Sequence, residues 1–254
     1  MAMLNRAGVG IYHQVSGHKT DKTPVLLTHG MYATSAMWEP NLPALGAGRQ
    51  IITWDIRGHG QSDYPDDQGL YTEALSVGDM EAILDSQGIQ RTVIGGLSLG
   101  GYLSMAFNLA FPERVVALML FDTGPGFRRD EPRQQWNDTV DALSKRIEET
   151  GLEAVSGGAE VDASKHRGLS GVVKAQRGIM KQFDGRIIES LPAISVPTLV
   201  VVGANDQPFL AAADYMAERI PNAEKVVIED AEHASNIDQP EAFNRAVLKF
   251  LDGI

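Results

Sequence analysis

Apolar residues along the chain gather into short runs that are rich in β-branched side chains. Most of these runs are continuously apolar rather than alternating, which is typical of central strands covered by helices on both faces. The pattern predicts seven strands, at residues 9–15, 24–29, 50–55, 91–97, 115–122, 197–203 and 224–229.

The segments between these runs carry apolar residues at the three- and four-residue spacing of amphipathic helices. Helices are predicted at residues 35–45, 72–87, 99–110, 208–220 and 239–251. Alternation of strands and helices favours parallel strand pairing. We therefore predict an α/β fold with a doubly wound, mostly parallel sheet.

Residues 124–191 interrupt this rhythm, because they contain no convincing strand although strand-like runs flank them. One helical face is predicted from four residues at helical spacing: Trp136, Val140, Leu143 and Ile147. A second face has one polar member and comprises Val172, Val173, Gln176, Ile179, Met180 and Phe183. We predict a helical cap at 124–191, inserted into a core formed by residues 1–123 and 192–254.

The chain has 254 residues, of which 43% are apolar and 22% are charged. These values are typical of a globular protein with one or two domains. The absence of cysteine excludes disulfides, thiolate metal sites and a cysteine nucleophile. The longest purely apolar run, Val115–Phe121, is too short to span a bilayer, and the N-terminus has no continuous apolar segment typical of a secretory signal. We expect a cytoplasmic protein.

The net charge of −11 argues against nucleic-acid and membrane partners, because an acidic surface repels phosphate backbones and anionic lipids. Residues 124–191 differ, since they hold eleven of the 22 basic residues together with eleven acidic ones. If several of these cations line the mouth of a cleft, they favour anionic substrates. If they pair with the neighbouring acids, they form a solvated surface.

A predicted strand leads into Gly96-Leu97-Ser98-Leu99-Gly100, and a helical pattern follows. This Gly-x-Ser-x-Gly arrangement is typical of a nucleophile elbow, a tight turn that pushes the serine hydroxyl out of the sheet. Small residues two positions before and after the serine let the strand and the helix approach closely. The pattern therefore predicts Ser98 as a nucleophile.

A serine hydroxyl needs a base and an orienting acid to act as a nucleophile at neutral pH. His233 follows the last predicted strand, and Asp206 follows the strand predicted at 197–203. Because the carboxyl ends of parallel strands meet at one edge of a sheet, both side chains are expected near Ser98. The chain order serine, aspartate, histidine is the one expected of this type of sheet.

These motifs resemble those of the α/β-hydrolase superfamily, in its single-domain branch with a helical cap. The resemblance covers nearly the whole chain and rests on His29-Gly30, Asp55-x-Arg57-Gly58-His59-Gly60-Gln61-Ser62, the serine elbow, Asp206 and His233. It implies that the backbone N–H groups of Met31 and Leu99 form an oxyanion hole, which stabilises the charge on a tetrahedral intermediate.

Four aromatic residues near these positions are candidates for lining a substrate pocket: Tyr32, Tyr102, Phe127 and Trp136. Aromatic side chains at such positions also commonly belong to the core. Both interpretations stay open at this point.

Asp122 and three histidines offer alternative assignments. Asp122 ends the strand predicted at 115–122 and is the alternative acid, because some members of the superfamily carry the acid after that strand. His29 precedes the oxyanion loop and is expected to be a structural hydrogen-bonding group. His59 lies in a glycine-flanked turn and is expected to be structural. His166 is expected to be solvated within the charged insertion.

The resemblance implies a serine hydrolase without a cofactor, and the leading hypothesis is a carboxylesterase that acts on small esters. Alternatives are an enol-lactonase or a C–C bond hydrolase of aromatic catabolism, a perhydrolase, and a ligand receptor that retains the triad. Enol-lactonases tend to have serine where this chain has His29, and C–C bond hydrolases usually have a more glycine-rich run at residues 30–33, so both are less favoured. Dehalogenases and epoxide hydrolases carry aspartate in place of Ser98, which disfavours them.

No His, Asp or Glu spacing in the sequence is typical of a metal site, and no Gly-x-Gly-x-x-Gly follows a predicted strand. We therefore expect neither a metal nor a dinucleotide cofactor. The expected partner is a small-molecule ester or lactone, and no feature of the sequence indicates an oligomeric state.

Overall fold

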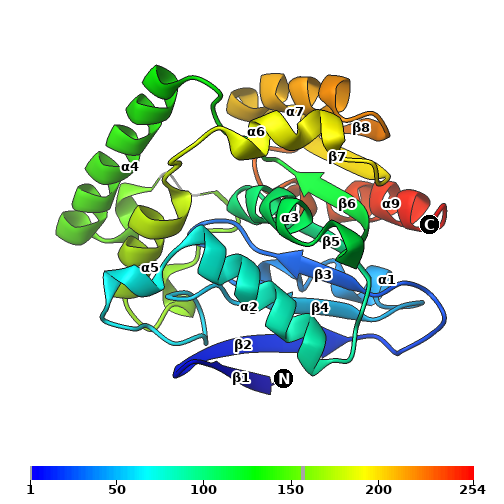
Figure 1. Ribbon diagram of the computed structural model, residues 1–254, viewed down its shortest axis with the longest axis horizontal. Coiled ribbons are helices and arrows are strands. Elements are labelled where there is room, and N and C mark those ends of the chain that lie inside the picture. Colours follow the sequence, from blue (N-terminus) through cyan, green and yellow to red (C-terminus); the bar gives the residue numbers. More distant parts are fainter. Residues whose placement is uncertain (1, 156–157) are drawn as a thin grey trace.

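A sheet of eight strands runs through the protein, and helices cover both of its faces (Figure 1). The structure, a computed structural model, describes residues 2–155 and 158–254. The strands are β1 (Ala2–Arg6), β2 (Val9–Ser16), β3 (Val25–Thr28), β4 (Ile51–Trp54), β5 (Thr92–Leu97), β6 (Val115–Phe121), β7 (Thr198–Gly203) and β8 (Ala223–Ile228).

The strand order is β1-β2-β4-β3-β5-β6-β7-β8. Along this order, every neighbouring pair from β4 to β8, β3 included, is parallel. At the other side of the sheet, β1 pairs with β2 and β2 pairs with β4 in antiparallel orientation. The predicted doubly wound, mostly parallel sheet is confirmed.

All seven predicted strands are present with small shifts at their ends, and β1 is an additional strand at the edge of the sheet. The residues of β1 neither alternate nor form an apolar run, because this edge strand remains mostly exposed. Ala7 and Gly8 join β1 to β2, and both have positive φ, at 51° and 87°. Such angles at both central residues are required by the tight hairpin turn that matches strand twist.

The α-helices are α1 (Leu42–Leu45), α2 (Glu73–Ser86), α3 (Leu99–Ala110), α4 (Asp130–Thr150), α5 (Leu169–Ala175), α6 (Arg186–Ser190), α7 (Gln207–Arg219), α8 (Ser235–Asp238) and α9 (Pro240–Leu251). Shorter helical turns are η1 (Ser35–Trp38), η2 (Gln68–Leu70), η3 (Pro112–Arg114), η4 (Leu152–Ala154), η5 (Ala163–Lys165), η6 (Gln176–Met180) and η7 (Leu191–Ala193). No helix formed by these described residues is long and apolar enough to cross a membrane.

The single helix predicted at residues 35–45 is wrong, because the chain there forms two short helices, η1 and α1. Pro40 and Pro43 explain the break. Neither proline has the backbone N–H that a continuous helix would need to bond the preceding turn.

Helices α2, α3 and α7 pack on one face of the sheet, and α1 and α9 pack on the other (Figure 1). On the second face, the ring of Phe121 lies 5.9 Å from that of Trp38 and 4.8 Å from that of Phe243, measured between centroids. Because both faces are covered, the carboxyl edge of the sheet is where polar side chains on loops can gather.

Among the residues that the structure describes, the segment 124–191 contributes helices and no strand. Helix α4 buries Val140 and Ile147 on the face that their spacing predicts. The prediction that Phe183 belongs to the second helical face is wrong, because this residue is 76% exposed. The chain becomes extended at Lys181, so Phe183 lies beyond the helical turn η6. Helices α4 and α5 lie beyond the edge toward which the arrows of β3 and β6 point (Figure 1).

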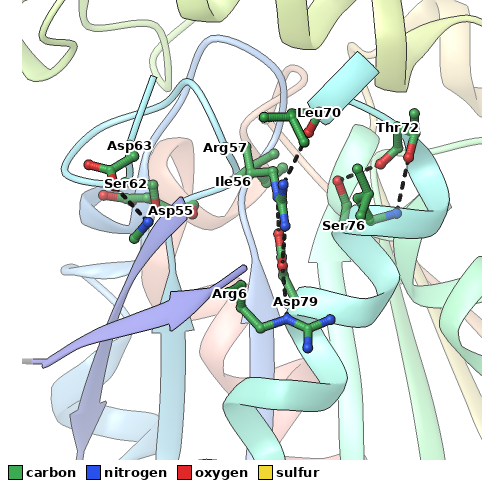
Figure 2. Close-up of polar contacts among 12 residues, drawn as sticks. Arg6, Asp55, Ile56, Arg57, Ser62, Asp63, Leu70, Thr72, Ser76 and Asp79 are labelled. Atoms are coloured by element: carbon green, nitrogen blue, oxygen red, sulfur yellow. Dashed lines mark hydrogen bonds and ion pairs between the residues drawn. The ribbon is translucent and has the colours of Figure 1, made fainter. Parts of the chain in front are cut away.

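A buried ion pair joins the turn after β4 to helix α2 (Figure 2). Nε and Nη2 of Arg57 donate to the two carboxylate oxygens of Asp79, at 2.6 and 2.8 Å. Arg57 also donates to the carbonyl of Leu70 at 3.3 Å. Arg6 of β1 reaches the same carboxylate from the surface, with Nε 3.4 Å from Oδ1. The sequence motif contained Arg57 but gave no signal for its partner.

We expect Asp79→Ala to lower the free energy of unfolding by about 3–5 kcal/mol, because it leaves the buried Arg57 guanidinium unpaired. Arg6→Ala is the matched control. It removes a partly exposed partner of the same carboxylate, so the loss should be at most about 1 kcal/mol. Urea unfolding followed by circular dichroism measures both free energies. Equal losses in the two variants would show that the buried ion pair contributes no more to stability than the partly exposed one.

Candidate active site

The turn between β5 and α3 holds Ser98 in a strained backbone conformation. Its φ and ψ are 55° and −117°, a combination that residues other than glycine rarely adopt. Gly96 and Gly100 permit this turn, because a Cβ on Gly96 would collide with the backbone of Gly100, and one on Gly100 with the carbonyl of Thr28. Ser98 is therefore placed at the carboxyl edge of the sheet, on a sharp strand-to-helix turn.

Two hydrogen bonds fix the backbone of Ser98 to the end of β6. Its N–H donates to the carbonyl of Phe121 at 2.9 Å, and the hydroxyl of Thr123 donates to the Ser98 carbonyl at 2.6 Å. The Thr123 side chain fills the space beside Gly101, where a Cβ would collide with it. The position of Ser98 thus depends on β6 as well as on β5.

Asp206 and His233 are hydrogen-bonded to each other. Nδ1 of His233 lies 2.8 Å from Oδ2 of Asp206. Asp206 follows β7 and its side chain is 4% exposed, while His233 follows β8 and its side chain is 27% exposed. The ring of Phe209 stacks on the imidazole with centroids 4.8 Å apart. The carboxylate and the phenyl ring together restrict the orientation of the imidazole.

The surroundings of His233 raise its pKa above the usual value. Burial alone lowers the pKa, because it disfavours the charged ring. The hydrogen bond and the charge of Asp206 outweigh burial, and the charges of Asp122 and Glu160 add to their effect. Each of these carboxylates stabilises the imidazolium that forms when the ring accepts a proton.

The structure brings Asp206 into contact with His233 and places Ser98 at the same edge of the sheet. Among the hydrogen bonds between described residues, none joins Oγ of Ser98 to His233. Catalytic hydrogen bonds are often long until a substrate is bound, so this spacing is compatible with a nucleophile and its base.

Asp122 is fully buried at the end of β6 and has a φ of 45°. Its carboxylate accepts hydrogen bonds from the N–H of Gly203, at 2.7 Å, and from the hydroxyl of Ser235. Burial raises the pKa of Asp122 to about 7, although both hydrogen bonds oppose the shift. Asp122 thus ties the end of β7 to the start of α8, while Asp206 is the carboxylate that contacts His233.

The two residues expected to form an oxyanion hole lie on neighbouring loops. Met31 lies in the loop after β3, and Leu99 is the first residue of α3. Strands β3 and β5 pair in parallel, so the loops that follow them meet at the same edge. The N–H of Leu99 has no partner inside its own helix, and this helix end favours negative charge.

His29 and Asp55 fix residues 30–35, which we call the oxyanion loop. Nδ1 of His29 donates to the carbonyl of Gly30 at 2.7 Å, and Nε2 accepts from the N–H of Ile56 at 3.0 Å. Asp55 accepts from the N–H of Ser35 at 2.7 Å. Burial lowers the pKa of His29 to about 4, so the ring is neutral. His29 is therefore a structural hydrogen-bonding group, as its position suggests.

The expectation that His166 is solvated is wrong. Its Nε2 donates to the carbonyl of Tyr32 at 2.8 Å, and Nδ1 accepts from the N–H of Gly60 at 3.3 Å. His59 is fully buried, and its ring lies 5.1 Å from that of His29 and 5.4 Å from that of His166, between centroids. The charged insertion folds against the core here, which partly buries His166 and gives both ring nitrogens a backbone partner.

The aromatic pocket candidates lie in three different surroundings. Tyr32 is buried in the oxyanion loop. Tyr102 is buried on α3, and burial raises its pKa, with the neighbouring Glu73 carboxylate adding to the shift. Trp136 donates to a backbone carbonyl of the cap, and Phe127 lies 6.1 Å from it between ring centroids. Phe127 and Trp136 therefore pack within the cap.

Six of the eleven basic residues between 124 and 191 form ion pairs with carboxylates: Arg133, Arg167, Lys174, Arg177, Lys181 and Arg186. This pairing favours the solvated surface over the electropositive gate. A cavity of about 240 Å³ lies between residues 34–40, α8 and the cap, and three carboxylates, those of Glu39, Glu160 and Asp162, share its lining with Lys165.

The sequence model of the alpha/beta hydrolase family matches residues 25–246, and the chain therefore belongs to this family. A protein named as a carbamate hydrolase from Caulobacter sp. (strain K31) is 28% identical, and the alignment covers 96% of each chain. The 3-oxoadipate enol-lactonase 1 of Acinetobacter baylyi is 26% identical over 99% of this chain and 97% of its own.

Among solved structures, a thermophilic esterase from Thermogutta terrifontis superposes with a TM-score of 0.83. It is 26% identical and covers 99% of this chain and 96% of its own. Together these relatives support hydrolase activity for the chain, and they differ in the substrates that their names give.

Proposed function

We propose that the protein is a serine hydrolase that cleaves small carboxylic esters through an acyl-enzyme. The observation that carries this proposal is the Asp206–His233 hydrogen bond, at the sheet edge that also holds Ser98 on its strained turn. A buried carboxylate on Nδ1 leaves Nε2 of the ring as the free basic nitrogen, which is what a general base requires.

In the proposed reaction, Oγ of Ser98 attacks the ester carbonyl carbon while Nε2 of His233 takes the hydroxyl proton. The backbone N–H groups of Met31 and Leu99 stabilise the tetrahedral oxyanion. His233 then gives the proton to the departing alcohol, which leaves the acyl group on Ser98. Water, activated by the same histidine, releases the acid and restores the enzyme.

A series of chromogenic short-chain esters tests this proposal. An esterase turns over many substrate molecules per chain at a constant rate. A ligand receptor that retains the triad would give one stoichiometric burst and then stop. Such a burst without further turnover would contradict the proposal.

An enol-lactone is the second candidate substrate class. It is favoured by the similarity to 3-oxoadipate enol-lactonase 1 along nearly the whole of both chains. A lactone is an internal ester, so the same steps open its ring, with the leaving enolate staying attached to the acyl group. Comparing kcat/KM for a matched enol-lactone and an open-chain enol ester decides between the two classes.

The pH dependence follows from the raised pKa of His233. Only the neutral ring accepts a proton, so kcat/KM should rise with pH. The midpoint of this rise should lie above about pH 6.5, which corresponds to the usual imidazole pKa. The measurement is kcat/KM from about pH 5 to 9, with chemistry shown to limit the rate. A profile that is flat over this range would exclude a histidine base.

We expect no preference for anionic substrates, because six of the eleven basic residues of the cap form ion pairs with carboxylates, and three carboxylates line the cavity beside the cap. A neutral ester should show a kcat/KM at least equal to that of an isostere with a free carboxylate. Any difference in kcat/KM between the two esters should become smaller when the salt concentration is raised to about 0.5 M. A preference for the anionic ester that disappears with salt would instead support an electropositive gate.

A further inference from the structure

One segment of the cap, residues 166–171, docks on the turn formed by residues 57–64 of the core. The N–H of Arg167 donates to Oη of Tyr64 at 3.1 Å, and its guanidinium lies 4.9 Å from the centre of the Tyr64 ring. Gly171 packs so closely on Gly58 that a Cβ on either residue would collide with the other. The other side of this turn is fixed by the Arg57–Asp79 pair (Figure 2).

The docked segment places His166 between two backbone groups of the core. The Tyr32 carbonyl can only accept and the Gly60 N–H can only donate, so Nε2 must carry the proton and Nδ1 must be bare. The ring is therefore neutral. Burial lowers the pKa of His166, which agrees with this protonation state.

Tyr32 is a strained point of the oxyanion loop, because its φ of 67° is in the left-handed region. Non-glycine residues keep such a conformation only where their surroundings hold it. His29 binds the carbonyl of Gly30 and Asp55 binds the N–H of Ser35, so the core holds both ends of the loop. His166 supplies the hydrogen bond to the middle of the loop, directly after Met31.

We propose that His166 is a positioning residue, which holds the oxyanion loop from the cap through its hydrogen bond to the Tyr32 carbonyl. The inference rests on the proposed role of the Met31 N–H. The Tyr32 carbonyl lies two peptide groups beyond the one that carries the Met31 N–H. If this carbonyl moves, the backbone of Met31 and Tyr32 turns with it, and the Met31 N–H loses its alignment with the oxyanion. The cap would thus contribute to catalysis through the backbone of the core.

Protonation of His166 should weaken this support, because a protonated Nδ1 faces the N–H of Gly60 and the repulsion between the two donors pushes the ring away from the Tyr32 carbonyl. The charged and titratable groups that face the ring are Asp55, Asp162, His29 and His59. The two carboxylates favour the protonated ring, and burial beside the other histidines opposes it.

Two substitutions separate the two hydrogen bonds of His166. His166→Gln places an amide where Nε2 lies and can still donate to Tyr32. His166→Asn places an amide where Nδ1 lies and can accept only from Gly60. We expect kcat to stay near the wild-type value in the Gln variant and to fall about tenfold or more in the Asn variant, with little change in KM.

Tyr64→Phe is the matched control. It removes the hydroxyl that accepts from Arg167 and donates to the Gly60 carbonyl, at 3.1 and 3.2 Å, but leaves the His166 bond in place. It weakens the docking of the same cap segment, so kcat should stay within about twofold of the wild type if the Tyr32 bond is what matters. An equal loss in the Tyr64 and Asn variants would show that docking alone matters, and would overturn the proposal.

Amide hydrogen exchange of peptides spanning residues 30–36 gives a readout that needs no activity. Exchange should be faster in the Asn variant than in the wild type, and unchanged in the Gln variant. Identical exchange in all three proteins would overturn the positioning role. If ester turnover proves independent of Ser98 while exchange behaves as expected, the proposed function fails and the support of the loop by His166 stands.

If the Asn variant does not fold, exchange of the same peptides in the wild type decides the question. Corrected for intrinsic rates, exchange should increase as pH falls through the pKa of His166. The Gln variant lacks this titration and should show no such increase. The same pH response in both proteins would overturn the proposal.

Discussion

Ester turnover should fall by at least about 10⁴-fold in Ser98→Ala, because a bare oxyanion hole retains only residual catalysis. The substitution removes one hydroxyl from a half-buried side chain, and the strained turn is held by backbone hydrogen bonds that alanine keeps. We therefore expect the variant to remain folded. Steady-state kinetics with a chromogenic ester measures kcat, and thermal unfolding checks the fold.

Ser86→Ala provides the matched control, since it removes a serine hydroxyl at the end of α2, away from the candidate site. It should leave kcat unchanged. A folded Ser98→Ala protein that keeps more than about a tenth of the wild-type turnover would remove Ser98 from the proposed mechanism.

The second large effect is expected at Asp206. Asp206→Asn should lower kcat by about 10³- to 10⁴-fold, through loss of tautomer control and of imidazolium stabilisation. Because the Asp206 hydrogen bond and charge raise the pKa of His233, the remaining activity should also show its pH limb at lower pH than the wild type.

Asp122→Asn is the comparison that separates the two carboxylates. The Asn side chain can still accept from Gly203 and interact with Ser235, so we expect a loss of less than about tenfold in kcat. The loss of a nearby negative charge should move the His233 limb modestly to lower pH. A larger loss of kcat in Asp122→Asn than in Asp206→Asn would mean that Asp122, at the end of β6, is the acid that orients His233.

The sequence predicted the positions of Ser98, Asp206 and His233 at one sheet edge because each lies directly or a few residues after a strand-like run. Parallel strands bring such positions together whatever the details of packing. The Gly-x-Ser-x-Gly spacing adds the local geometry, since it describes a turn that needs small residues at two fixed places.

Contacts between distant segments had no such local signal. Phe209 stacks on His233, and Asp79 pairs with Arg57, but neither spacing repeats along the chain. His166 looked solvated because its neighbours in the sequence are charged. Its burial depends on how the cap docks on residues 57–64, which periodicity cannot predict. The break at residues 35–45 did have a signal, in its two prolines.

Covalent labelling tests most directly whether Ser98 is the nucleophile. The folded protein is treated with a fluorophosphonate, which reacts with activated serine hydroxyls, and peptide mapping by mass spectrometry locates the label. We expect one label per chain, on the peptide that contains Ser98, and none in Ser98→Ala. A label on another residue, or undiminished labelling of the variant, would contradict the assignment of Ser98.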